Sequence, residues 1–68
     1  MTITGAARLA GVMGWPVSHS LSPALHNFWL REYDIDGVYI PLAVAPEAFE
    51  GSLVALRQLG FAGVNVTV

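Results

Sequence analysis

The sequence predicts an α/β fold in three layers, a parallel β-sheet between helices, built in the order β-α-β-α-β. Short runs rich in apolar and β-branched residues predict strands at residues 9–13, 38–44 and 63–68. Apolar side chains at helical spacing predict helices at residues 23–33 and 45–59 between them. Strands that alternate with helices pair in parallel through right-handed crossovers, and the helices cover the sheet.

Local signals define the first strand and the first helix. Residues 1–7 show no periodicity and predict a loose lead-in. The run Leu-Ala-Gly-Val-Met predicts a buried strand, which Pro16 ends because proline lacks an N–H donor. Ser22 followed by Pro23 is typical of a helix start, since the serine hydroxyl can accept a backbone N–H and proline fits the first helical position. An apolar stripe supports this helix: Leu25, Phe28 and Trp29.

The remaining elements also have clear signals. Pro41 within residues 38–44 indicates an edge strand or a bulge, because proline cannot donate to a neighbouring strand. Gly60, which follows the second apolar stripe, predicts a left-handed helix C-cap. Residues 63–68 alternate strictly, so Asn65 and Thr67 share one face of the third strand and the valines share the other.

The composition restricts the class of protein. The 68 residues are 54% hydrophobic and only 12% charged, with three arginines, no lysine and a net charge of −2. This balance argues against nucleic-acid binding, which needs a basic surface. The lack of cysteine, of a secretory signal and of a membrane-length apolar run predicts a soluble, cytoplasmic protein with no membrane partner. The low charge predicts that further protein covers part of the surface, and the strand that stops at Val68 predicts that the chain is truncated there.

Two polar clusters lie at the carboxyl ends of predicted strands. Ser20 and Ser22 precede the first helix, where free N–H groups and the helix dipole favour an anion such as a carboxylate. Asn65 and Thr67 lie at the end of the third strand, and open parallel sheets bind their ligands at this edge. The two clusters therefore predict one crevice suited to a small polyhydroxylated acid. A plainer interpretation of the serines, a simple helix cap, stays open at this point.

Other side chains are candidates for supporting roles or for a metal site. His19 is expected to order the serine loop through a hydrogen bond, and Tyr39 either lines the crevice or is structural. His19 and His26 lie seven residues apart, but no carboxylate or cysteine is spaced to complete a metal site, so we expect none. The spacing of Gly11 and Gly14 does not match the glycine-rich dinucleotide fingerprint.

Together, these motifs resemble those of the shikimate dehydrogenases. Residues 14–27 read Gly-x-Pro-x-x-His-Ser-Leu-Ser-Pro-x-x-His-Asn, and residues 63–68 read Gly-Val-Asn-Val-Thr-Val. The resemblance covers nearly the whole chain after Ala7. It implies reversible, NADP-dependent reduction of 3-dehydroshikimate to shikimate, in the chorismate pathway of aromatic amino-acid biosynthesis. It also implies that residues 1–68 are an incomplete part of the N-terminal substrate-binding domain, and that the NADP-binding Rossmann domain lies outside this chain.

The resemblance implies roles for individual residues. Ser20 and Ser22 resemble the hydroxyls that hold the shikimate carboxylate, and Thr67 resembles the threonine that contacts the substrate from the other side. The residues expected to support them are His19, Tyr39 and Asn65. The family's proposed acid/base lysine would lie just beyond Val68, so we expect no catalytic residue in this chain and no activity from the chain alone. The expected partner is the small-molecule substrate, and the resemblance is compatible with a homodimer of the whole enzyme.

Two other functions remain open from the residues alone. A quinate or dual quinate/shikimate dehydrogenase would use the same motifs, and the Ser20-x-Ser22 pair only leans toward shikimate. A small non-catalytic α/β module could instead use the serine loop to bind an anion. Continuation of the coding sequence after Val68 into Pro-x-Lys would favour the enzyme, whereas a stop codon would favour the module.

Overall fold

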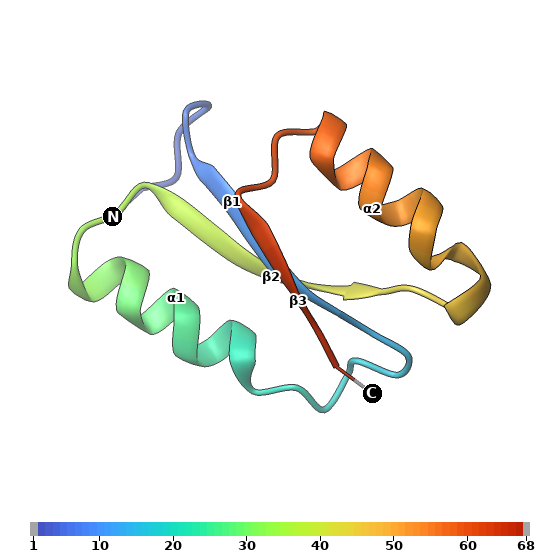
Figure 1. Cartoon of the computed structure of the whole chain (residues 1–68). Coiled ribbons are helices and arrows are strands. Elements are labelled where there is room, and N and C mark those ends of the chain that lie inside the picture. The colour runs from blue at the N-terminus through green and yellow to red at the C-terminus, as the bar shows by residue number, and fades with distance from the viewer. Residues whose placement is uncertain (1, 68) are drawn as a thin grey trace.

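A three-stranded parallel sheet between two helices makes up the computed structural model, which describes residues 2–67 (Figure 1). The elements are β1 (Arg8–Gly14), α1 (Ser22–Glu32), β2 (Gly37–Ala43), a short 3-10 helix η1 (Pro46–Ala48), α2 (Phe49–Gln58) and β3 (Gly63–Val66). This order confirms the predicted α/β fold. The third strand was predicted to reach Val68, which lies outside the described residues, and β3 ends one residue before Thr67.

Strand β1 lies at the centre of the sheet, in the order β2-β1-β3, and both of its neighbours run parallel to it. It pairs with β2 along its whole length and with β3 from Ala10 to Met13. Strand β2 lies at the edge of the sheet, which confirms one of the two alternatives predicted from Pro41. Pro41 pairs with Val12 in unbroken register, so the other alternative, a bulge, does not form. Because all three strands are parallel, their carboxyl ends lie at the same end of the sheet.

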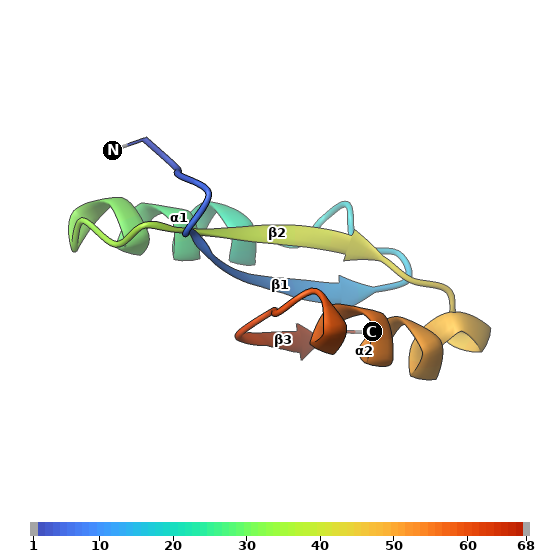
Figure 2. The same cartoon turned by 90° about the horizontal axis from the view of Figure 1, so that it is seen from above.

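The two helices lie on opposite sides of the sheet (Figure 1). Seen from above, α1 lies at the level of β2 and α2 at the level of β3 (Figure 2). The arrangement confirms the three predicted layers. Within residues 2–67, no helix has both the length and the apolar character needed to cross a bilayer.

The core is small: a cluster lies between the sheet and α1, and Met13, which is 1% exposed, is buried outside that cluster. Val12, Val17 and Tyr39 form a buried cluster, against which Ala10 and Leu30 pack. Neither helix, each of which lies wholly within the described residues, contains a fully buried residue. Large apolar side chains stay exposed on and around both helices: Leu21, Phe28, Trp29, Val54 and Leu59. The low charge of the sequence therefore corresponds to apolar surface that this chain leaves uncovered.

The start of α1 differs from the prediction. Leu21 occupies the capping position with a nearly helical backbone (φ −93°, ψ −2°), so Ser22 is already the first helical residue and its hydroxyl does not cap the helix. Ser20 Oγ instead accepts the Ser22 N–H at 3.3 Å. Pro23 lies in the first turn, where its missing N–H is not needed. In the Ser20-x-Ser22 motif, the first serine therefore accepts a backbone N–H at the helix start, and the second does not.

The prediction of a loose N-terminal lead-in is wrong at Thr4. Its backbone N–H donates to Asp36 Oδ1 at 3.1 Å, and its hydroxyl donates to Asp36 Oδ2. The Arg8 N–H donates to the Asp36 carbonyl at 2.9 Å. A side chain just before β2 therefore ties this segment to the sheet, a long-range contact that sequence periodicity cannot register.

Both helices end with a residue in the left-handed region. After α2, Gly60 has φ 83°, and the Phe61 N–H donates to the Leu56 carbonyl at 3.0 Å, which confirms the predicted glycine cap. After α1, the equivalent residue is Asp34, with φ 52°. The next amide again donates back into the last turn of the helix, at 2.8 Å. The same left-handed helix C-cap thus follows both helices. It is formed by glycine after α2 and by aspartate, which suits this region less well, after α1.

We expect Asp34→Gly to stabilise the protein and Gly60→Ala to destabilise it, each by about 1 kcal/mol. A side chain in the left-handed region is strained, and a carboxylate at a helix C-terminus also opposes the helix dipole. Denaturant unfolding of the intact protein measures both changes.

Asp34→Asn separates the two causes, because asparagine removes the charge and still tolerates the left-handed region. An Asp34→Gly variant with an unchanged or lower unfolding midpoint would show that neither strain nor charge at this position limits stability.

Candidate functional site

A hollow lies where the carboxyl ends of β1 and β3 meet. Its volume is about 280 Å³, just below the usual range for small-molecule sites. The residues that line it come from the loop after β1 and from the residue after β3: Pro16, Val17, His19, Ser20 and Thr67. Three of the predicted site residues, His19, Ser20 and Thr67, are therefore brought together at the predicted edge of the sheet.

The loop that carries Ser20 is held from both sides. Val17 is buried in the core cluster, and its carbonyl accepts the Ser20 N–H at 3.1 Å. On the other side, Ser20 Oγ accepts the Ser22 N–H at the start of α1. These contacts place the Ser20 hydroxyl at the positive end of the helix dipole, where an anion is favoured. His19 is exposed and makes no hydrogen bond within residues 2–67, so the structure does not show the expected ordering bond from its imidazole.

Ser22 lies beside this hollow and not in its lining. It borders a separate, open surface groove formed by Leu21, just before α1, and by apolar residues of the helix: Ala24, Leu25 and Phe28. The backbone hydrogen bond to Ser20 Oγ nevertheless keeps the two serines adjacent. Of the predicted serine pair, only Ser20 faces Thr67 across the hollow.

Thr67 forms the opposite wall, and a close backbone approach sets its position. Its N–H donates to the Met13 carbonyl at 2.8 Å, which continues the β1–β3 ladder by one step. A Cβ placed on Gly14 would lie only 2.7 Å from Thr67 Cγ2 and 3.1 Å from the Pro16 carbonyl oxygen. Glycine is therefore required at the end of β1 for Thr67 and the loop to pack against it.

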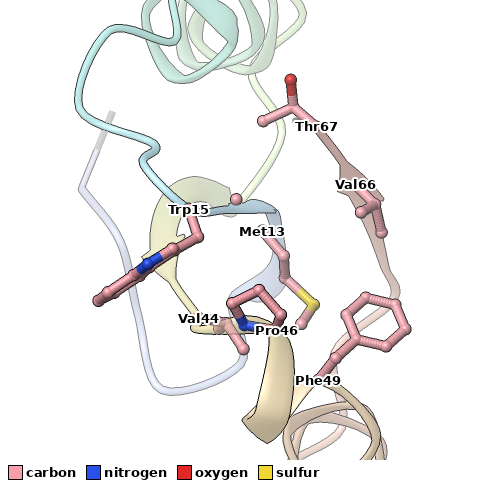
Figure 3. Close-up of a pocket in the computed structure, with 8 residues that line it drawn as sticks. Met13, Trp15, Val44, Pro46, Phe49, Val66 and Thr67 are labelled. Carbon is pink, nitrogen blue, oxygen red and sulfur yellow. The ribbon is translucent and has the colours of Figure 1, made fainter.

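A second hollow, of about 350 Å³, lies next to the first one and shares Thr67 with it. Apart from Thr67, its lining consists of glycine and apolar or aromatic residues: Met13, Gly14, Trp15, Val44, Pro46, Phe49 and Val66. In Figure 3 the Thr67 hydroxyl points away from Met13 and Phe49. This second hollow offers little hydrogen bonding and suits apolar packing better than it suits a polar acid.

Tyr39 lies behind the site and is not among the residues that line either hollow. Its side chain is 4% exposed, and its hydroxyl donates to Asn65 Oδ1 at 3.0 Å. The His26 ring stacks on the Tyr39 ring with 4.1 Å between centroids and 9° between planes. Of the two interpretations of Tyr39 that the sequence left open, the structure supports the structural one, with a contact to Asn65.

Asn27 is a structural residue that the sequence reasoning did not single out. Its Nδ2 donates to the Tyr39 carbonyl at 2.8 Å, and its Oδ1 accepts the Tyr39 N–H at 2.9 Å. The sequence did contain a signal for this role. Asn27 is an amide residue at the end of the motif at residues 14–27, and the predicted edge strand has backbone groups that need hydrogen-bond partners.

The charges and ring nitrogens limit the chemistry of the site. His19 is the one titratable side chain in the lining of the first hollow. His26 Nδ1 lies 3.0 Å from the Ser22 carbonyl, to which it must donate, since a carbonyl only accepts. Among residues 2–67, no three side chains of the kinds that ligate metals gather at one place. The hollow can therefore hold a small polar ligand by hydrogen bonds from hydroxyl, imidazole and backbone groups.

Comparison with known proteins gives consistent matches along the chain. The family described as the shikimate dehydrogenase substrate binding domain matches residues 12–68. A shikimate dehydrogenase (NADP(+)) of Rhodospirillum rubrum is 70% identical over 66 residues, which cover 97% of this chain and 23% of that protein. The crystal structure of shikimate dehydrogenase from Aquifex aeolicus has a TM-score of 0.95 and 36% identity, over 98% of this chain and 25% of that one.

A further solved structure contains ligands. Shikimate 5-dehydrogenase from Listeria monocytogenes, in complex with shikimate and NAD, superposes with a TM-score of 0.93 and 31% identity. The match covers 100% of this chain and 24% of that one. The chain thus spans about a quarter of the length of the relatives that it matches.

We expect Gly14→Ala to destabilise the protein by about 1–3 kcal/mol, the usual effect of overpacking, because the new methyl group collides with Thr67 Cγ2. Thr67→Ser removes that methyl group and keeps the hydroxyl, so the double variant should recover part of the loss. Denaturant unfolding measures both effects.

Gly63→Ala is the matched control, because a Cβ at this strand residue would meet nothing within 4 Å. Equal destabilisation by Gly14→Ala and Gly63→Ala would mean that loss of glycine in a strand, and not the contact with Thr67, is responsible.

Proposed function

Because this chain belongs to the family of shikimate dehydrogenase substrate-binding domains, we propose that it forms part of the substrate site of an NADP-dependent shikimate dehydrogenase. The proposed reaction is the reversible reduction of 3-dehydroshikimate to shikimate, in aromatic amino-acid biosynthesis. The observation that carries the proposal is the hollow between Ser20 and Thr67, which the two family-like motifs line from opposite sides.

In this proposal the start of α1 receives the substrate carboxylate. Ser20 lines the hollow directly, and its hydroxyl can donate to a carboxylate oxygen while still accepting the Ser22 N–H. Ser22 supplies a second hydroxyl from the adjacent position, which requires its side chain to turn from the apolar groove toward the ligand. Thr67 contacts the substrate from the opposite wall, and His19 and Asn65 support these contacts. The helix dipole favours a negative charge at this position, and the exposed imidazole can donate a hydrogen bond to it.

The residues of this chain bind and orient the substrate in this proposal, and the reactive groups lie elsewhere in the whole protein. The sequence has no lysine, and no carboxylate lines the hollow. NADP supplies or accepts the hydride when it is bound, and residues 1–68 contain no glycine-rich fingerprint to hold it. We therefore assign NADP and the proton-transferring residues to parts of the enzyme outside these residues, which form part of its N-terminal substrate domain.

The location and assembly of the whole enzyme belong to the same proposal. We infer a cytoplasmic enzyme that forms a homodimer; cell fractionation and sizing chromatography of the whole protein test these two statements. Quinate is the alternative substrate, and parallel kinetics with quinate and shikimate measure the preference.

We expect Ser20→Ala in the whole enzyme to raise KM for shikimate about ten- to a hundred-fold, with a much smaller change in kcat. A hydrogen bond to a charged group contributes roughly 1.5–3 kcal/mol, and a contact of equal strength in the ground and transition states acts mainly on KM. Steady-state kinetics with shikimate and NADP measure both constants.

Ser18→Ala is the matched control, because Ser18 is exposed two residues earlier in the same loop and borders a different hollow. An unchanged KM in Ser20→Ala would remove Ser20 from the carboxylate site. Binding of shikimate by a whole protein that does not turn it over would favour the non-catalytic anion-binding module.

A further inference from the structure

We propose that Tyr39 is a positioning residue for the substrate site. Its buried hydroxyl holds the Asn65 side-chain amide in the orientation that turns Nδ2, the hydrogen-bond donor, toward a substrate oxygen. This inference rests on the proposed function. Neither Tyr39 nor Asn65, which was predicted to line the crevice, is among the residues that line the hollow, so Asn65 would reach the substrate from the edge of that hollow.

The direction of the hydrogen bond carries the first step. The Tyr39 hydroxyl lies 3.0 Å from Asn65 Oδ1, and an amide oxygen can only accept, so the phenol donates. That bond turns Oδ1 toward Tyr39 and leaves both hydrogens of Nδ2 without a protein acceptor among residues 2–67. Asn65 is exposed, and in an extended strand it shares a face with Thr67, two residues further on.

The reverse orientation of the amide is disfavoured. It would turn Nδ2 toward the phenol oxygen and leave the phenol O–H without an acceptor, because Tyr39 has no other side-chain partner among the described residues. The side chain is 4% exposed, and a buried donor without an acceptor costs free energy. Asn65 therefore presents a donor, and not an acceptor, on the side away from Tyr39.

Several contacts fix the position of Tyr39, so that it can determine the orientation of the Asn65 amide. Both of its backbone polar groups are bonded to the Asn27 amide, at 2.8 and 2.9 Å. The His26 ring stacks on its own ring, and His26 in turn donates to the Ser22 carbonyl at the start of α1. The same helix start that carries the serine motif thus also fixes the tyrosine that orients Asn65.

The test uses the whole enzyme and the variant Tyr39→Phe, which keeps the ring and its stacking and removes only the hydroxyl. We expect KM for shikimate to rise about three- to tenfold, the effect of losing one neutral hydrogen bond, with a smaller change in kcat. Tyr33, at the end of α1, provides the matched control. This residue is 73% exposed, and Tyr33→Phe likewise removes only a hydroxyl.

A double-mutant cycle separates positioning from a merely structural role. Asn65→Ala should raise KM by itself, and adding Tyr39→Phe to it should raise KM no further, because the hydroxyl acts through that amide. An additive effect of Tyr39→Phe in the Asn65→Ala background would overturn the inference. If Tyr39→Phe fails to fold, Asn65→Asp replaces it: this side chain offers only acceptors, so KM should rise as in Asn65→Ala, and a wild-type KM would overturn the inference.

The possible failures are distinguishable. A whole wild-type protein that does not turn over shikimate contradicts the proposed function. A wild-type protein that is active, with an unchanged KM in Tyr39→Phe, contradicts only the role of Tyr39.

Discussion

The pair of hydrogen bonds between the Asn27 amide and the backbone of Tyr39 is the contact on which the arrangement of this chain depends. Strand β2 is at the edge of the sheet, so Tyr39 would otherwise leave an N–H and a C=O without a strand partner. The amide satisfies both groups as a neighbouring strand would, and it belongs to α1. A helix without any fully buried residue is thereby fastened to the sheet at a defined height and rotation.

That height and rotation determine where the serine loop lies. The loop must run from the end of β1 to the start of α1, with Val17 buried in the core between them. Its two internal hydrogen bonds then leave Ser20 opposite the residue that follows β3. The position of the Ser20 hydroxyl thus follows from the hydrogen bonds between Asn27, further along the helix, and the edge strand.

The alternation of strands and helices and the glycine cap after α2 were predicted from the sequence, and the edge position of β2 was one of two alternatives predicted from Pro41. Each has a local cause in apolar spacing or backbone preference. The meeting of Ser20 with Thr67 was also predicted, because parallel strands bring their carboxyl ends to one edge. The capping role of Ser22 was predicted wrongly: Leu21 occupies that position, and the Ser22 N–H donates to Ser20 Oγ. The contacts of Thr4, Asn27 and Tyr39 join residues far apart in the sequence, and no periodicity encodes them.

The central position of β1 also has a consequence for the order of folding. Its pairing with β2 closes a shorter loop of chain than its pairing with β3, and loop closure is entropically cheaper for shorter loops. A nascent chain can therefore assemble β1, α1 and β2 first, with the serine loop already in place. The Met13 carbonyl accepts the Thr67 N–H only after the second crossover has closed, so the far wall of the hollow is completed last.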